Sequence, residues 1–275
     1  MSIQITLLGT GSPLPSADRA GPATLVRAGG ATLLVDCGRG VVMRLTAAGV
    51  LPVGLSAVLL THLHSDHITD LNDIITSHWV MSPGPVGLRV IGPPGTQRVV
   101  DGILAMLAQD VQYRMDHHET LNAAPAVEVT EVEPGAALQV ADATVGIHGT
   151  DHRPVTPTVG YRVEHGGVVA ALAGDTVPCA GLDALCAGAD LYVQTVIRAD
   201  LVRAIPNARV QDILDYHSTV EQAAQTAARS GVATLVLTHY VPPMIPGTEE
   251  EWRALAAEHF SGPIVLGEDM TTVSA

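Results

Sequence analysis

Four potential metal ligands stand within six residues, directly after an apolar run. Residues 57–61 have the branched, apolar character of a buried strand, and His62, His64, Asp66 and His67 follow. Side chains alternate along extended backbone, so His62 and His64 are expected on one face, before the chain turns into a helix. Imidazole and carboxylate groups suit zinc, and also manganese or iron. The spacing therefore indicates two adjacent metal ions at the end of a strand.

Short apolar runs rich in Val and Leu are interleaved with helical patterns along the 275 residues. Predicted strands cover 3–8, 31–36, 57–61, 88–91, 144–148, 158–164, 168–173, 189–194 and 233–238, with hairpin turns at the glycine pairs 29–30 and 166–167. Predicted helices cover roughly 39–49, 68–80, 96–108, 220–230 and 249–259. A strand-rich half with helices precedes a similar second half. This order predicts an α/β (or α+β) fold in which two sheets pack face to face, with helices outside and a break near 120–126.

Two of the predicted helices carry start signals. Ser218 and Glu221 have the spacing of a capping box, as do Thr248 and Glu251. Gly231 stands where a helix C-cap belongs. The region after residue 216 therefore reads as a loop that enters a well-defined helix.

Composition narrows the class of protein. The formal net charge is −14 and only 14 residues are Lys or Arg, which disfavours general binding to nucleic acid. No apolar run approaches the roughly 20 residues that a membrane span needs, and the chain opens on a strand pattern without a signal segment. Three cysteines with no CxxC pair indicate neither disulfides nor a thiolate zinc site. We expect a cytoplasmic protein that does not interact with membranes.

The His-x-His-x-Asp-His pattern resembles that of the metallo-β-lactamase superfamily, and more narrowly its ribonuclease Z and arylsulfatase-like subgroup. Matching segments follow in order: Leu-Gly-Thr-Gly-Ser at 8–12, Val-Asp-Cys-Gly at 35–38, Ala-Gly-Asp-Thr at 173–176, His-Ser-Thr at 217–219 and Leu-Thr-His-Tyr at 237–240. The resemblance implies a single domain, 1–275, with the four-layer αββα sandwich of that fold. Its two half-units would cover roughly 1–122 and 123–275.

The resemblance also implies a ligand set for two divalent metal ions, with Zn²⁺ as the expected metal and Mn²⁺ or Fe²⁺ as alternatives. One ion would take His62, His64 and a third histidine. The other would take Asp66, His67 and His239, with the Asp175 carboxylate shared: the full set is His62, His64, Asp66, His67, His152, Asp175 and His239.

The third histidine is either His148 or His152. Asp151 and His152 precede Gly-Tyr-Arg at 160–162 in the way the resemblance implies, whereas His148 alternates within a predicted strand. We favour His152.

The resemblance implies hydrolysis by a hydroxide held at the dinuclear site. Asp66 would orient the nucleophile or accept its proton, and His217 would assist departure of the leaving oxygen. The competing interpretation of His217 is a histidine that only helps to cap the following helix. For the substrate, Arg19, Arg39 and Arg162 are candidates on grounds of charge alone.

The lead prediction is a ribonuclease Z-like phosphodiesterase, acting on small or non-tRNA phosphodiesters. The segment 15–20 lacks the Lys and Asn of tRNA-maturing members, and only a hairpin fits between Arg162 and Asp175, where many members insert a tRNA-gripping arm. Gln194 and Thr195 replace a His-Glu pair. Ser65 and Asp70 favour the alternative, an arylsulfatase or other ester hydrolase.

A third possibility, from another class, is a non-catalytic member that binds metal or another ligand through a vestigial site. The presence of all seven ligand positions argues against it. The expected partners are a small phosphodiester or sulfate ester, with RNA disfavoured by charge. The resemblance also suggests a homodimer.

Overall fold

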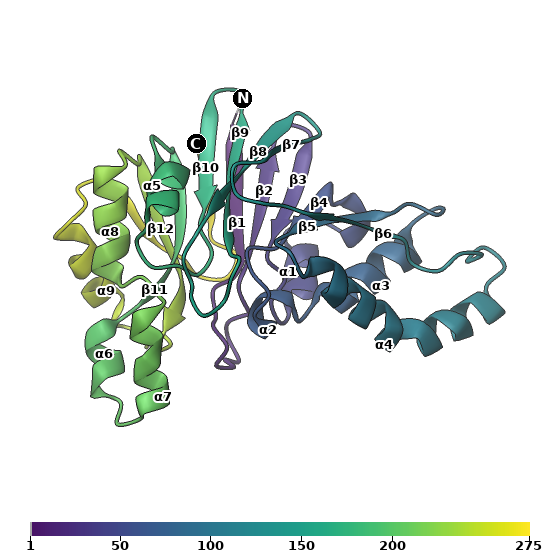
Figure 1. Ribbon diagram of the computed structural model, residues 1–275, viewed down its shortest axis with the longest axis horizontal. Helices are drawn as coiled ribbons and strands as arrows, with labels where there is room; N and C mark the ends of the chain where they lie inside the picture. The colour runs from purple at the N-terminus through teal and green to yellow at the C-terminus, as the bar shows by residue number, and fades with distance from the viewer. Residues whose placement is uncertain (1) are drawn as a thin grey trace.

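The computed structural model describes residues 2–275 and builds two seven-stranded sheets that face each other, with helices outside (Figure 1). The strands are β1 (Ile3–Gly9), β2 (Ala23–Ala28), β3 (Ala31–Val35), β4 (Ala57–Leu59), β5 (Leu88–Gly92), β6 (Val127–Glu131), β7 (Ala137–Val140), β8 (Ala143–Gly149), β9 (Val159–His165), β10 (Val168–Leu172), β11 (Leu191–Ile197), β12 (Thr234–Val241), β13 (Ile264–Leu266) and β14 (Thr272–Ser274). The first sheet has the order β14-β1-β2-β3-β4-β5-β6 and the second β13-β12-β11-β10-β9-β8-β7. The predicted α/β sandwich is confirmed.

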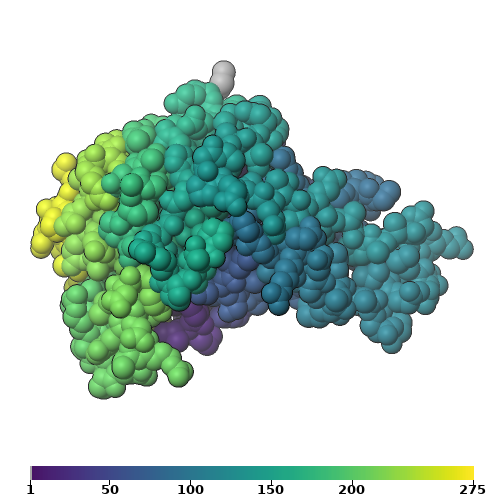
Figure 2. Space-filling view, viewed as in Figure 1, coloured from purple at the N-terminus to yellow at the C-terminus, as the bar shows by residue number. Residues whose placement is uncertain are grey.

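The helices cover the outer faces of the sheets. They are α1 (Val41–Ala47), η1 (Pro52–Gly54), α2 (Ser65–Ile68), α3 (Leu71–Met81), α4 (Thr96–His117), α5 (Ala180–Cys186), α6 (Ala199–Ala204), α7 (Ala208–Gln211), η2 (Asp212–Asp215), α8 (Val220–Arg229) and α9 (Glu249–Ala257). Helix α4 and the loop after it extend away from the sheets at the right of Figures 1 and 2, and α6 and α7 extend below the second sheet. None of the described helices is long and apolar enough to cross a membrane.

Strands buried on both faces explain the continuous apolar runs of the sequence. In β3, Leu33 and Val35 pack between the two sheets, whereas Leu34 packs under the helices of the first half. In β12, Val236 packs between the sheets, and Leu235 and Leu237 pack against α8 and α9. Because neighbouring side chains point to opposite faces, a strand between two packed layers must be apolar at every position.

The strands next to the site are parallel, which sets where their polar residues gather. Strands β3 to β6 pair in parallel in the first sheet, and β10 to β13 do so in the second. Parallel strands bring their carboxyl ends to one edge of a sheet. Asp36, His62, Asp175 and His239 therefore reach a common region although they are far apart in the sequence.

Several predicted elements need correction. Strands β6, β7, β13 and β14 were not predicted, because short or half-exposed strands have weak apolar patterns. Strand β2 is almost wholly buried and was implied by the predicted hairpin at 29–30, but it was given no bounds. Helix α4 continues nine residues beyond the predicted end at 108. The helix predicted over 68–80 is divided into α2 and α3. The reason is that the amide of Asp70 donates to the carbonyl of Cys37 (2.9 Å) rather than to the preceding turn.

The predicted capping box is shifted by one residue. Thr219 caps α8 by accepting from the amide of Gln222 (3.2 Å), and Gln222 Oε1 accepts from the amide of Thr219 (2.9 Å). Ser218 instead donates its hydroxyl to the carbonyl of Thr176 (2.7 Å). Thr248 does begin α9, but its side chain caps no amide there. Gly231 has the positive φ (68°) of a residue that ends a helix, as predicted.

Chain order and sheet membership do not coincide fully. Strand β6 belongs to the first sheet, beyond the expected boundary at 122, and β14 returns to the first sheet beside β1. The division into two half-units stays a prediction. The hairpin glycines lie where they were predicted, between β2 and β3 and between β9 and β10, and Gly29, Gly166 and Gly167 have positive φ.

Candidate metal centre

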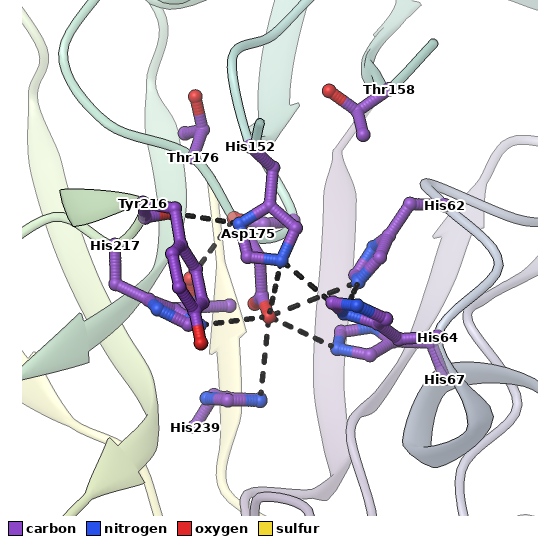
Figure 3. Close-up of polar contacts among 12 residues, drawn as sticks. His62, His64, His67, His152, Thr158, Asp175, Thr176, Tyr216, His217 and His239 are labelled. Atoms are coloured by element: carbon purple, nitrogen blue, oxygen red, sulfur yellow. Dashed lines mark hydrogen bonds and ion pairs between the residues drawn. The ribbon is translucent and has the colours of Figure 1, made fainter. Parts of the chain in front are cut away.

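Seven histidine and aspartate side chains converge where the two sheets meet. Figure 3 labels all of them except Asp66. They form two groups, and within each group the potential ligand atoms lie within 4.8 Å of one another. The first group is His62, His64, His152 and Asp175, and the second is Asp66, His67 and His239. All seven positions named from the sequence are thus brought together.

Asp175 occupies the centre of this cluster. Its Oδ2 atom lies 3.5 Å from His67 Nε2, 3.7 Å from His239 Nε2 and 3.8 Å from the Nε2 atoms of His62 and His152. It follows β10 through Gly174, whose φ of +65° and close contact with Thr61 leave no room for a Cβ. A carboxylate in this position can serve both groups.

The donor atoms that face the cluster fit a cation. His64 Nδ1 lies 3.1 Å from His62 Nε2 and 3.3 Å from His152 Nε2, so nitrogen lone pairs converge with no protein donor between them. His67 Nε2 and Asp175 Oδ1 are buried without a hydrogen-bond partner. Buried polar atoms are normally paired, and metal ions satisfy such atoms. The residues present therefore fit the divalent metal ions that the pattern implies.

Burial and neighbouring charges shift the pKa values of the ionisable groups in opposite directions. Burial alone would raise the pKa of Asp175, but His239, His67 and His217 outweigh it and hold the pKa well below its ordinary value. Burial lowers the pKa of His152 to about 4, so its imidazole is neutral at pH 7. A neutral imidazole offers a lone pair without first losing a proton.

Neighbouring groups fix the histidine rings. His67 donates from Nδ1 to Asp36 Oδ2 (2.8 Å), and His152 donates from Nδ1 to the carbonyl of Tyr216 (2.7 Å). Each of these bonds leaves Nε2 facing the cluster with a free lone pair. The role of Asp36 was not identified from the sequence, although a carboxylate directly after a buried strand was a signal for it.

His148 and Arg162 lie elsewhere. Both line an open groove on the outer face of the second sheet, beside α5. The Arg162 guanidinium donates to the carbonyls of Leu185 and Ala187 and pairs with Glu164 (2.6 Å). The candidacy of Arg162 for substrate binding was therefore wrong, because its charge serves the outer surface.

His217 lies inside the site. Its Nε2 is 3.3 Å from Asp175 Oδ2, and its Nδ1 donates to the carbonyl of Ile213 (3.1 Å). It precedes α8 by three residues but makes no bond to the helix amides, since Thr219 supplies the cap. The structure therefore gives His217 a place beside the cluster rather than a capping bond.

Gln194 and Thr195, at the positions of the absent His-Glu pair, are buried and support the Asp175 loop. The Thr195 hydroxyl donates to the carbonyl of Gly174 (3.0 Å). The Gln194 amide accepts from the Tyr192 hydroxyl (2.6 Å) and donates to the carbonyl of Thr195 (2.8 Å). Neither side chain contacts His217, whose ring is oriented by a main-chain carbonyl instead.

Comparison with known proteins shows the family to which the chain belongs. Residues 31–240 match the family described as "Beta-lactamase superfamily domain". The chain is 57% identical over 273 residues to a protein named "Ribonuclease Z" from Mycolicibacterium paratuberculosis, and the match covers 98% of each chain. The chain belongs to the ribonuclease Z family of the metallo-β-lactamase superfamily.

Solved structures agree on the fold of this ribonuclease Z family member. The metallo-beta-lactamase fold protein YhfI from Bacillus subtilis superposes with a TM-score of 0.76 at 21% identity, covering 100% of this chain and 99% of the other. The short form of human tRNase Z superposes with a TM-score of 0.70 at 23% identity, covering 98% of each chain. The predictions of a metallo-β-lactamase fold and of a ribonuclease Z-like metal-dependent hydrolase are confirmed. Asp70, one of the two residues that favoured an arylsulfatase, accepts from the amide of Val42 (3.2 Å) at the start of α1.

Proposed function

We propose that this protein cleaves RNA phosphodiester bonds by hydrolysis with two divalent metal ions, zinc in the first instance. The observation that carries the proposal is the Asp175 carboxylate, buried between two groups of histidine and aspartate ligands. The whole-chain similarity to proteins named ribonuclease Z supports RNA as the substrate. Zinc is favoured over manganese and iron because five of the seven donors are imidazoles.

In the proposed assignment, His62, His64 and His152 would hold one ion, Asp66, His67 and His239 would hold the other, and Asp175 would serve both. Bound metal ions supply a lowered pKa for water and neutralise charge on the phosphate oxygens. The surrounding residues of the protein fix the orientation of the histidine rings that would bind these ions. Asp36 and the carbonyl of Tyr216 hold two of the rings by hydrogen bonds to Nδ1.

Hydrolysis of a phosphodiester requires proton transfers, and we assign these to Asp66 and His217. A water oxygen forms a bond to phosphorus, the bond from phosphorus to the leaving ribose oxygen breaks, and that oxygen needs a proton. His217 carries its Nε2 into the site and is fixed at Nδ1, so it is placed to deliver the proton. Asp66, whose Oδ2 lies 3.3 Å from His239 Nε2, would orient the attacking water and accept the proton that the water loses as its oxygen bonds to phosphorus.

Charge bears on how RNA is held. The chain has 14 Arg residues, no Lys, and a net charge of −14, so only local clusters attract a polyanion. Arg203 and Arg209 lie exposed on α6 and α7, and Arg19 lies on the loop between β1 and β2. We expect few phosphate contacts, and so a shallow dependence of the binding constant on salt.

A paired assay tests the function. Zinc-loaded protein is given a structured RNA with an unpaired 3′ extension, bis-p-nitrophenyl phosphate, and p-nitrophenyl sulfate. Cleavage of RNA that is lost in Asp175→Ala, and kept in the surface control Asp183→Ala, supports the proposal. If the protein hydrolyses bis-p-nitrophenyl phosphate but does not cleave RNA, its substrates are small phosphodiesters, as the composition of the chain led us to expect. Sulfate hydrolysis alone would replace the proposal with a sulfatase.

A further inference from the structure

Tyr216 is a partly exposed aromatic side chain beside the site, in a protein that has few aromatic residues. The chain has five Tyr, two Trp and one Phe. Six of these eight are buried in the cores: Tyr161, Tyr192, Tyr240, Trp79, Trp252 and Phe260. Tyr113 is 66% exposed on α4, which extends away from the sheets. Tyr216 alone is both partly exposed and next to the candidate metal ligands.

The ring of Tyr216 lies beside the rings of two histidines of the site. Its centroid lies 4.7 Å from that of His217 and 5.2 Å from that of His152 (Figure 3). Its main-chain carbonyl accepts from His152 Nδ1, so backbone and ring share a neighbour. The phenol makes no hydrogen bond to any residue that the structure describes. Packing in the protein interior therefore does not account for this side chain.

A partly exposed aromatic ring beside a site that cleaves phosphodiesters is suited to stacking against a nucleobase. Every nucleobase has a π-face, so a base stacks on a tyrosine ring without sequence preference. A stacked base also places its own phosphate, since sugar and phosphate are joined to it. We propose that Tyr216 stacks against the base of a nucleotide adjoining the phosphate that is cleaved. This inference rests on the proposed function, with RNA as the substrate.

The placement of Tyr216 makes it a positioning residue, because one short segment of chain both orients two histidines and carries the aromatic ring. The segment formed by η2 and Tyr216, which follows it, orients His152 and His217 through the carbonyls of Tyr216 and Ile213. The same segment presents the ring. A base stacked on Tyr216 is thereby placed relative to His152, which belongs to the cluster, and to His217, which lies beside it.

The experiment compares Tyr216→Ala, Tyr216→Phe and Tyr216→Trp with the wild-type enzyme on RNA and on the same RNA with an abasic ribose at either nucleotide flanking the cleaved bond. Tyr113→Ala is the matched control, and zinc content is measured for every variant. We expect Tyr216→Ala to raise KM for intact RNA about tenfold or more, as the loss of one base–aromatic stack does. Phe and Trp should restore KM, because they keep the ring.

The abasic substrate separates stacking from a structural role. With one of the two abasic RNAs, wild type should lose about the same factor as Tyr216→Ala loses on intact RNA. On that abasic RNA, Tyr216→Ala should have the same KM as the wild type. Equal loss on intact and abasic RNA, or no loss in Tyr216→Ala while the wild type cleaves RNA, overturns the inference and leaves the proposed function standing. If the wild type cleaves no RNA, the proposed function falls, and the inference falls with it.

Discussion

Asp36 Oδ2 accepts a 2.8 Å hydrogen bond from His67 Nδ1, and the same carboxylate reaches His62 through Thr61. The Thr61 hydroxyl donates to Asp36 (2.8 Å), which leaves its lone pair to accept from His62 Nδ1 (3.0 Å). One buried carboxylate thus orients a histidine in each of the two ligand groups. Asp36 has a φ of 61°, a conformation that Asp and Asn tolerate better than other residues with a side chain.

We therefore predict that Asp36→Asn, which keeps the tolerated backbone conformation, weakens both groups. Loss of the charged acceptor should lower zinc affinity or kcat/KM about 10–100-fold, as for other residues that orient metal-binding histidines. Zinc stoichiometry by mass spectrometry and steady-state kinetics measure the two effects. Asp70→Asn, whose carboxylate contacts α1 and no histidine, is the control. Unchanged zinc affinity and kinetics in Asp36→Asn would show that the rings are held without Asp36.

Removal of metal should destabilise the protein as well as inactivate it. His67 Nε2 and Asp175 Oδ1 are buried without partners, so the folded chain gains binding free energy that the unfolded chain lacks. At a free zinc concentration 100 times Kd, the gain is about 2.7 kcal/mol per site. Thermal unfolding with and without a chelator measures it. An Asp175→Ala variant should show a smaller difference in Tm, and an equal difference would place the binding energy elsewhere.

The metal-free protein should lose stability in mild acid. The pKa of His152 is lowered by burial to about 4 in the folded chain, against its ordinary value near 6.5. A histidine with a lowered folded pKa contributes stability that is present above pH 6.5 and lost as the pH falls toward 4. Between pH 7 and pH 5 this amounts to about 1–2 kcal/mol. Urea unfolding of chelated wild type and His152→Gln at both pH values isolates this contribution, and a pH dependence unaltered by the substitution would contradict it.

Asp269 should be a stability determinant outside the site. Its carboxylate accepts from the amide of Thr10 (3.0 Å), the amide of Ala20 (2.7 Å) and Nε of Arg44 (3.1 Å), and its side chain is only 7% exposed. Asp269→Ala leaves these donors without an acceptor, which should cost about 2–4 kcal/mol. Urea denaturation measures the loss. Asp183→Ala, which removes an exposed ion pair with Arg229, should cost far less.

The sequence was informative wherever a chemical pattern was dense. The presence of four potential ligands within residues 62–67 predicted that they form one site. Asp175 and His239 were placed at that site because each follows an apolar run. Contacts between distant segments were harder to predict. That the carbonyls of Ile213 and Tyr216 orient two histidines cannot be inferred from residue types, because every residue has a carbonyl. Tyr216 itself was not singled out, since its exposure depends on how η2 packs.

The errors in secondary structure have similar causes. Strands β6 and β7 are half-exposed at the outer ends of their sheets, so their sequences lack a strong apolar period. The split between α2 and α3 depends on a bond from Asp70 to Cys37, more than thirty residues earlier in the chain. A pattern read within a short window does not contain that partner.

Strand β14 pairs with β1, joining Gln4 to Ser274 and Ile5 to Val273 across the edge of the first sheet. Gln4 and Ser274 are 270 residues apart in the chain, so β1 cannot gain this partner until all the residues between the two strands have been made. Until then this side of β1 stays unpaired. A variant from which β14 is removed would keep that edge exposed, and with it a surface on which strands of other chains can add.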